Sequence, residues 1–178
     1  SGEKIVHDPR LVWNTLDIVD AHDGVTVQSK SGHAFIKQVM REHNAVYGGE
    51  MSAHHYFRDF AYCDSGMIPW LLVLTLLSET QQSLSTLVEN MIAKFPCSGE
   101  INFKVADTQI TIQNIFDFYA EQNPEIDRTD GVSLDFGAWR FNVRASNTEP
   151  LLRLNIESRA DRQAQPMQRY VDELTRLI

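Results

Sequence analysis

The chain has few cysteines, no long apolar run and no excess of basic residues. Cys63 and Cys97 are its two cysteines and lie far apart, so we expect reduced thiols and a cytoplasmic protein. The most apolar run, residues 67–77, is far shorter than the roughly 20 residues of a membrane span. It predicts a buried core helix and no membrane partner.

Negative charge is spread evenly along the sequence. Residues 1–96 carry 7 Lys and Arg against 11 Asp and Glu, and residues 97–178 carry 9 against 13, within a net charge of −8. Each half therefore has four excess negative charges, which argues against a nucleic-acid partner. A phosphorylated small molecule remains compatible where a few cations gather locally.

Familiar catalytic signatures are also missing, among them the P-loop, the GxSxG elbow and the dinucleotide fingerprint. The six histidines all lie between residues 7 and 55, which raises the possibility of a metal site. His54 and His55 are adjacent and would point to opposite sides of a strand, and Cys63 with Asp64 completes no standard zinc spacing. We therefore expect no bound metal in this chain.

The first half of the sequence alternates strand and helix patterns. Strands are predicted at residues 4–7, 25–29 and 45–47, and helices at 11–20 and 33–42. This order is typical of βαβ units, so we expect a three-layer α/β domain at residues 1–95 with a mostly parallel sheet. Polar residues 48–65 are expected to form a loop before two further helices at 66–78 and 83–93.

The pattern changes after a stretch punctuated by Pro96 and Gly99, which indicates a domain boundary and a hinge near residues 95–99. A smaller α+β domain with an antiparallel sheet is expected at residues 98–178. Its predicted strands are 101–105, 132–136, 138–144 and 151–157, and its predicted helices are 108–120 and 167–178.

Polar residues follow each strand of the predicted parallel sheet, where ligands of such sheets bind. Arg10 follows the first strand, Lys30 and His33 the second, and a Gly-Glu-Met-Ser-Ala-His segment at residues 49–54 the third. In the second half, Arg144 to Pro150 lie between two strands and combine a guanidinium, hydroxyls and an amide, which suits a phosphate. The alternatives are ordinary turns, an N-cap at Ser31 and a structural Glu50.

Together these segments resemble the third and fourth domains of the α-D-phosphohexomutase superfamily, and bacterial phosphomannomutases most closely. The segment at residues 49–54 is similar to the family's sugar loop, with Ala53 at a position usually held by Gly, and residues 30–33 are similar to its (K/R)(T/S)GH segment. Arg144 to Pro150 match its phosphate loop. The resemblance assigns substrate contacts to ten residues: Glu50, Ser52, His54, Arg10, Lys30, His33, Arg144, Ser146, Asn147 and Thr148.

The resemblance implies a phosphate shift between mannose 6-phosphate and mannose 1-phosphate through a hexose 1,6-bisphosphate. The family's phosphoserine and its Mg²⁺-binding loop have no counterpart in this sequence, so no catalytic residue or metal ligand is expected here. The chain does not begin with Met, and we expect it to be a piece of a longer protein whose N-terminal domains are its partners. Such a fragment would hold a phosphorylated hexose without turning it over.

The sequence leaves other functions open. The chain could be a stand-alone sugar-phosphate-binding module, or part of a phosphoglucomutase or dual-specificity enzyme. A small metal-dependent enzyme that uses the histidines is a third class. The sequence does not separate mannose from glucose specificity, because the sugar loop is expected to bind the O3 and O4 hydroxyls that the two hexoses share.

Overall fold

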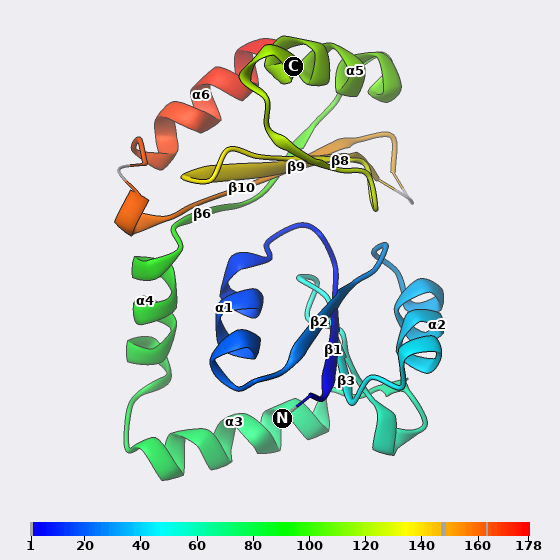
Figure 1. Cartoon of the computed structure of the whole chain (residues 1–178), viewed down its shortest axis with the longest axis vertical. Coiled ribbons are helices and arrows are strands. Elements are labelled where there is room, and N and C mark those ends of the chain that lie inside the picture. Colours follow the sequence, from blue (N-terminus) through cyan, green and yellow to red (C-terminus); the bar gives the residue numbers. More distant parts are fainter. Residues whose placement is uncertain (1, 147–148, 163) are drawn as a thin grey trace. The chain divides into compact units, whose positions relative to one another are not determined.

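The computed structural model describes residues 2–146, 149–162 and 164–178 (Figure 1). It divides into two compact units, residues 1–92 and residues 93–178, which are described separately. Within the described ranges, every helix is too short or too polar to cross a lipid bilayer.

The first unit is built on a five-stranded mixed sheet with the order β2-β1-β3-β4-β5. Strand β1 pairs in parallel with β2 and β3, as the βαβ pattern predicts, whereas β3–β4 and β4–β5 are antiparallel. Helices α1 and α2 cover opposite faces of the sheet, which makes three layers (Figure 1). The elements are β1 (Lys4–His7), α1 (Trp13–Ala21), β2 (Val25–Gln28), α2 (His33–His43), β3 (Tyr47–Gly49), β4 (His55–Phe57) and β5 (Cys63–Asp64).

Strands β4 and β5 correct the expectation that residues 48–65 form one loop. They are three and two residues long and flank a short 3₁₀ helix at Arg58–Phe60. Strands this short cannot display the alternation of apolar and polar residues that marks a strand in sequence. Tyr56 on β4 is nevertheless fully buried, in a core cluster that includes Val6, Ile36 and Met40.

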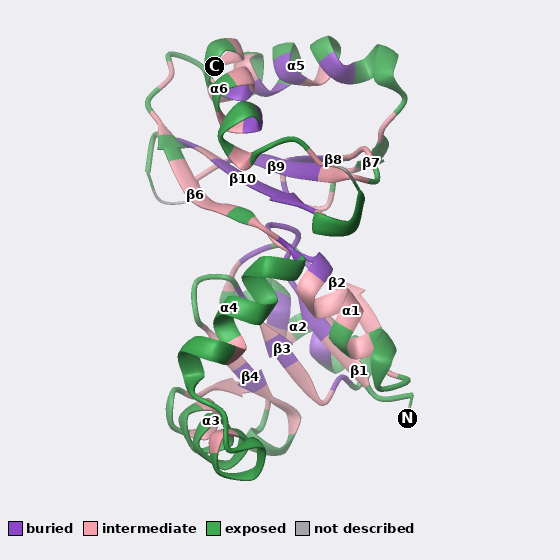
Figure 2. Cartoon of the chain, turned by 90° about the vertical axis from the view of Figure 1, so that its left-hand side faces the viewer, coloured by how far each residue is buried: buried purple, intermediate pink, exposed green. Residues whose placement is uncertain are grey.

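The apolar helix α3 (Met67–Thr80) is not buried, contrary to the expectation of a core helix. Every residue of α3 is at least partly exposed, including Trp70 at 55% and Leu72 at 56%, and Figure 2 shows α3 and the next helix, α4 (Leu84–Lys94), mostly in the exposed colour. A helix that is apolar on all sides normally packs against a partner surface. Composition predicts the need for that surface but not the element that provides it.

The second unit contains an antiparallel sheet with the order β6-β10-β9-β8-β7, as expected for an α+β domain. Helices α5 and α6 both cover one face (Figure 1). The strands are β6 (Cys97–Phe103), β7 (Glu125–Asp127), β8 (Val132–Asp135), β9 (Trp139–Ala145) and β10 (Leu152–Ser158), and the helices are α5 (Thr108–Tyr119) and α6 (Met167–Leu177).

Alternation along β9 and β10 gives this sheet one apolar and one polar face. Phe141 and Val143 lie opposite Ile156 and Leu154, and all four are fully buried in the core. The intervening residues of β9 are Arg140, Asn142 and Arg144, whose cross-strand neighbours on β10 are Glu157, Asn155 and Arg153. Because side chains alternate along a strand, Arg144 belongs to the face opposite the helices.

Strand β6 begins at Cys97, four residues before the predicted start. The register with β10 shifts between Asn155 and Glu157, and the Ser98 hydroxyl accepts a hydrogen bond from the Ile156 N–H at 2.9 Å. This irregular pairing lets the strand continue through Gly99, so a bulge in β6 lies within the stretch that was predicted to be a domain boundary and hinge.

Candidate functional site

The loops that follow β1 and β3 meet at the carboxyl edge of the parallel strands and are joined by Asp8. Its Oδ2 atom accepts hydrogen bonds from the Met51 N–H at 2.9 Å and from Nη2 of Arg10 at 2.5 Å. Asp8 and Arg10 are both nearly fully buried. Arg10 Nη2 also lies 3.4 Å from the Ser52 hydroxyl. The Asp8–Arg10 pair therefore fixes the backbone of the loop that carries Glu50 and Ser52.

Glu50 joins the loop after β2 to the loop after β3. Its Oε1 accepts the Gly32 N–H at 2.7 Å, and its Oε2 accepts the Tyr56 hydroxyl at 2.6 Å. Gly32 precedes helix α2 with φ 123°, a conformation that glycine adopts more readily than other residues. The positive end of the α2 dipole thus faces a carboxylate of the chain itself.

Burial and the hydrogen bond to Glu50 both raise the pKa of the Tyr56 hydroxyl far above its ordinary value. Tyr56 therefore remains the proton donor to Glu50 at neutral pH. Glu50 and Tyr56 form one buried pair, since Glu50 is 9% exposed and Tyr56 is fully buried.

Replacing Tyr56 by phenylalanine tests the Glu50–Tyr56 pair. We expect Tyr56→Phe to lower the free energy of opening of the first unit by about 1–3 kcal/mol, because Glu50 loses a buried donor. Tyr62→Phe is the matched control, since the Tyr62 hydroxyl bonds Asn44 at 3.3 Å in an exposed position. Hydrogen exchange of the β1 and β3 amides measures the free energy of opening in both variants. Equal protection of these amides in the two variants would contradict the expected role of Tyr56.

His33, His54 and Asp64 cluster beside the Glu50–Tyr56 pair. His54 Nδ1 lies 2.8 Å from Asp64 Oδ2, and Asp64 Oδ1 accepts the His55 N–H at 2.9 Å. The His33 ring, on the first residue of α2, lies 4.4 Å from the His54 ring between centroids. Partial burial acts to raise the pKa of Asp64, but the hydrogen bonds from His55 and His54 and the nearby charges of His54 and His33 outweigh it, so this pKa lies below its ordinary value.

His55 is oriented differently from His54, as the sequence predicted for adjacent residues. Its Nδ1 lies 2.6 Å from the hydroxyl of Tyr47 on β3. Burial raises the pKa of Tyr47 to about 12, so its hydroxyl remains protonated. We expected no chelate because His54 and His55 are adjacent, but the structure instead brings His54 together with His33 and Asp64.

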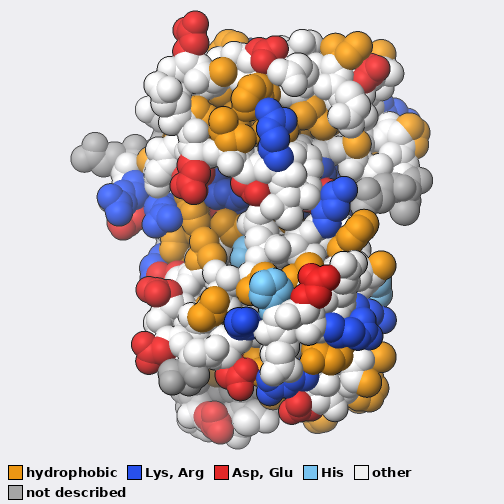
Figure 3. All heavy atoms as spheres, turned by 45° about the vertical axis from the view of Figure 1, so that its right-hand side comes forward, with side chains coloured by type: hydrophobic (Ala, Val, Ile, Leu, Met, Phe, Trp, Pro, Cys, Tyr) orange, Lys and Arg blue, Asp and Glu red, His pale blue; other side chains and the backbone are white. Residues whose placement is uncertain are grey.

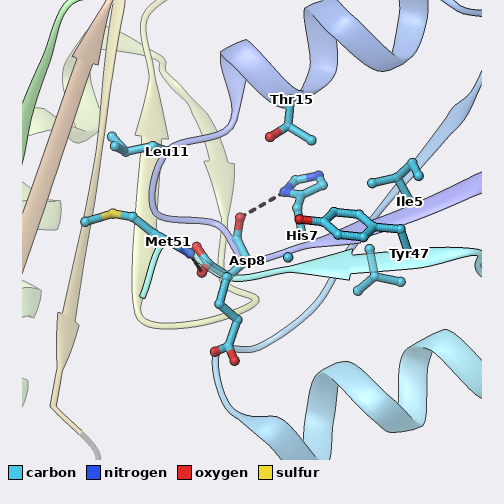
Figure 4. A pocket seen from close by; sticks show the side chains of 10 residues that line it. Ile5, His7, Asp8, Leu11, Thr15, Tyr47 and Met51 are labelled. Atoms are coloured by element: carbon cyan, nitrogen blue, oxygen red, sulfur yellow. Dashed lines mark hydrogen bonds between the residues drawn. The ribbon is translucent and has the colours of Figure 1, made fainter. Parts of the chain in front are cut away.

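A cavity of about 200 Å³ lies on one side of these loops (Figure 4). Its lining includes Ile5 and Tyr47 from the sheet, Thr15 from α1 and Leu11 from the loop between β1 and α1. Glu50 is the predicted contact residue that borders it. This volume is below the range of 300–1,000 Å³ typical of ligand pockets. We therefore place the candidate site on the loops themselves and not inside the cavity.

The remaining predicted residues of the first unit lie on or beside the same loops. Ser52 and His33 are exposed, and His54 is partly exposed. Lys30 is exposed too, and its Nζ lies 5.5 Å from the ring centre of Phe35 on α2. Figure 3 shows basic and acidic side chains interspersed with histidines on one face of the molecule, in line with the even charge distribution.

In the second unit, Arg144 lies at the end of β9 among acidic and basic side chains. Its guanidinium is 3.8 Å from Glu100 and 4.0 Å from Asp130, and it is almost fully buried. Arg153, its cross-strand neighbour, pairs with Glu100 at 3.1 Å and with Glu149 at 2.9 Å. These contacts hold a pair of guanidinium groups at the base of the following loop.

The loop after Arg144 closes on itself. The Ser146 N–H donates to the Leu151 carbonyl at 2.8 Å, and the Glu149 N–H donates to the Ser146 hydroxyl at 3.3 Å. Asn147 and Thr148, also predicted as contacts, lie outside the described residues. Arg144 and Ser146 thus both lie at the carboxyl end of β9, where the Ser146 N–H is held by the Leu151 carbonyl.

Comparison with known proteins assigns both units. Residues 1–95 match the family described as phosphoglucomutase/phosphomannomutase, alpha/beta/alpha domain III, and residues 100–174 match phosphoglucomutase/phosphomannomutase, C-terminal domain. The chain belongs to the phosphoglucomutase/phosphomannomutase family. The resemblance inferred from the sequence motifs is therefore confirmed.

Relatives in this family are longer than the chain. A protein of Xanthomonas campestris named for phosphohexose mutases is 63% identical over 160 residues, which is 90% of this chain and 36% of that protein. A phosphomannomutase of Vibrio cholerae is 57% identical over 178 residues, covering 99% of this chain and 38% of its own length. The chain thus spans somewhat more than a third of these mutases.

Solved structures support the fold. A phosphoglucomutase/phosphomannomutase family protein from Burkholderia thailandensis has a TM-score of 0.76 at 24% identity, over 99% of this chain and 37% of its own. Two structures of Aspergillus fumigatus N-acetylphosphoglucosamine mutase, one with glucose 1,6-bisphosphate and one with GlcNAc-6P and magnesium, have TM-scores of 0.66 and 0.61 at 13% and 12% identity. Each covers 98% of this chain and 37% of its own.

Sequence reasoning missed the residues that support the proposed contacts. Asp8, Tyr56 and Asp64 each hold a predicted site residue by a hydrogen bond of 2.5–2.8 Å. Alternation offered a signal for Tyr56, because residues 54 and 56 lie on the same side of an extended segment. The pairing of Asp64 with His54 depends on the antiparallel contact of β4 and β5, which the sequence did not reveal.

Proposed function

We propose that this chain is the sugar-phosphate-binding part of a phosphomannomutase, which interconverts mannose 6-phosphate and mannose 1-phosphate through a hexose 1,6-bisphosphate. The observation that carries the proposal is the joining of three strand-end loops through Asp8 and Glu50. This arrangement presents Ser52, His33 and His54 at the edge of a parallel sheet, where ligands of such sheets bind.

The first domain, residues 1–95, would recognise the sugar. Each Glu50 oxygen accepts one hydrogen bond from Gly32 or Tyr56, and a carboxylate oxygen can accept two. Glu50 therefore retains acceptor capacity for the O3 and O4 hydroxyls, with Ser52 beside it. Arg10 would hold the loop through Asp8, while Lys30, His33 and His54 would supply donors to the sugar phosphate.

The second domain, residues 98–178, would hold the phosphate that is not being transferred. Arg144 can offer a planar fork of N–H groups to phosphate oxygens, and Ser146, Asn147 and Thr148 would add hydroxyl and amide donors. Positioning and charge neutralisation are the main contributions a protein makes to phosphoryl transfer. In this proposal, the chain supplies positioning and the remainder of the longer protein supplies the phosphoserine.

Magnesium, which family members use to assist the transfer, does not fit the described residues of this chain. The group of three candidate ligands within those residues is His33, His54 and Asp64, and Mg²⁺ prefers oxygen ligands in octahedral geometry. We therefore assign no step to Mg²⁺ on this chain, and we expect the isolated chain to be inactive.

Activity of the longer protein that contains this chain tests the proposal. We expect it to convert mannose 6-phosphate to mannose 1-phosphate, and Glu50→Gln to reduce kcat/KM. His22→Ala, at the exposed residue that follows α1, is expected to leave kcat/KM unchanged. The same assay with glucose 6-phosphate measures hexose specificity. Full activity of the Glu50→Gln enzyme, or no conversion by the unmodified one, would contradict the proposal.

A further inference from the structure

The cluster of His33, His54 and Asp64 has a geometry that sugar binding does not require. The three residues come from the start of α2, the residue before β4 and the end of β5. Each offers one potential ligand atom, and these atoms all lie within 4.8 Å of one another. Two imidazoles and a carboxylate are therefore gathered at one point from three separate segments.

The carboxylate of this cluster is held in place by the strand beside it. Asp64 Oδ1 accepts the His55 N–H at 2.9 Å, which leaves Oδ2 facing His54 Nδ1 at 2.8 Å. The His33 and His54 rings meet edge to face at 4.4 Å.

We propose that His33, His54 and Asp64 form a binding site for a divalent late transition-metal ion, with Zn²⁺ as the representative ion. Imidazole and carboxylate ligands together suit Zn²⁺, Ni²⁺ and related ions, whereas Mg²⁺ and Ca²⁺ require mostly oxygen ligands. Three protein ligands with a fourth position open to solvent is a common arrangement for a zinc site.

The distances require little rearrangement. Zinc–nitrogen and zinc–oxygen bonds of about 2.0–2.2 Å in a tetrahedron place neighbouring ligand atoms about 3.4 Å apart. The metal would replace the proton shared by His54 and Asp64, and their atoms would separate by about half an ångström to admit it. His33 is exposed at the first turn of α2, so its side chain can rotate toward the ion.

Metal occupancy has a consequence that rests on the proposed function. The ion would occupy His33 and His54, two of the side chains assigned to the sugar phosphate. Metal and sugar phosphate would then compete for the same imidazoles. A transition-metal ion bound at His33, His54 and Asp64 would therefore inhibit binding of the sugar phosphate.

Zinc titration of the full 178-residue chain tests the site without any sugar. We expect calorimetry in phosphate-free buffer to show one equivalent of Zn²⁺, and His33→Ala to weaken binding by about tenfold or more. His33 is exposed, so its replacement leaves the core intact. His22→Ala is the matched control, because His22 is also exposed and bonds only locally to the Ile18 carbonyl.

Thiols must be excluded, since Cys63 adjoins Asp64 and both cysteines are unbridged. All titrations therefore use a Cys63→Ser, Cys97→Ser background, and an amide NMR spectrum of each variant confirms that it is folded. His54→Ala provides a second ligand variant with the same expected loss. Equal Zn²⁺ affinity in the His22, His33 and His54 variants, or no binding to the parent, would overturn the metal site and leave the proposed sugar-phosphate function untouched.

Discussion

Replacing Arg144 by alanine is expected to weaken the binding of mannose 6-phosphate by roughly 10- to 150-fold. This corresponds to the loss of a charge-assisted hydrogen bond worth about 1.5–3 kcal/mol. Arg144 is buried beside Glu100 and Asp130, so its guanidinium is already oriented before a phosphate binds. Calorimetry on the full chain measures the affinity.

Two further variants separate charge from geometry. Arg144→Lys retains the positive charge but lacks the planar fork, so we expect its affinity to fall between those of the parent and the alanine variant. Arg162→Ala removes an exposed cation from the same unit and is expected to have no effect. Equal affinities for the parent and Arg144→Ala would remove Arg144 from the proposed phosphate site.

Gly131→Ala is expected to destabilise the second unit more than any surface change in it. Gly131 has φ 71°, and a Cβ there would lie 2.2 Å from the Val143 carbonyl oxygen and 2.5 Å from Arg144 Cβ. Those atoms belong to β9, so the start of β8 would have to move away from its partner strand. Left-handed strain and overpacking together predict a loss of about 2–5 kcal/mol.

Gly137→Ala is the matched control for this prediction. Gly137 has φ 80°, but among the described residues no neighbouring atom would lie within 4 Å of an added Cβ, so the cost is about 1–2 kcal/mol of backbone strain. Hydrogen exchange of the β9 and β10 amides reports the free energy of opening of both variants. If Gly131→Ala is no less stable than Gly137→Ala, the close approach of Gly131 to Val143 and Arg144 is wrong.

The candidate site could be located from sequence because parallel strands place their carboxyl ends at one edge. Periodicity identified β1 and β2 but placed the third strand at residues 45–47, two residues before β3 (Tyr47–Gly49). The polar residues after these strands could still be expected to meet. Periodicity also placed Arg144 at the end of a predicted strand of the antiparallel sheet. The hydrogen bonds of Asp8 with Met51 and of Glu50 with Gly32 show that the first set of loops does meet.

Features that depend on short or non-local contacts could not be predicted. Strands β4, β5 and β7 have only two or three residues each, too few for a periodic signal. The pairing of His54 with Asp64 follows from the antiparallel contact of β4 with β5. The exposure of α3 was not predicted either. An apolar composition indicates that a helix packs against another surface but does not identify that surface.

Backbone conformation adds one detail to the loop that carries Glu50 and Ser52. Ala53 has φ 64°, in the left-handed region. Its N–H donates to the Glu50 carbonyl at 3.0 Å, and the His54 carbonyl accepts the Glu50 N–H at the same distance. The loop thus keeps a tight turn that a glycine would form with less strain.

An amide NMR titration of the full chain with mannose 6-phosphate tests the proposed sugar-phosphate site most directly. We expect saturable shifts for Gly32, Glu50 and Ser52 in the first unit and for Arg144 and Ser146 in the second, with much smaller shifts for unphosphorylated mannose. Saturable shifts confined to other segments, or none in these loops at concentrations that saturate the longer enzyme, would contradict it.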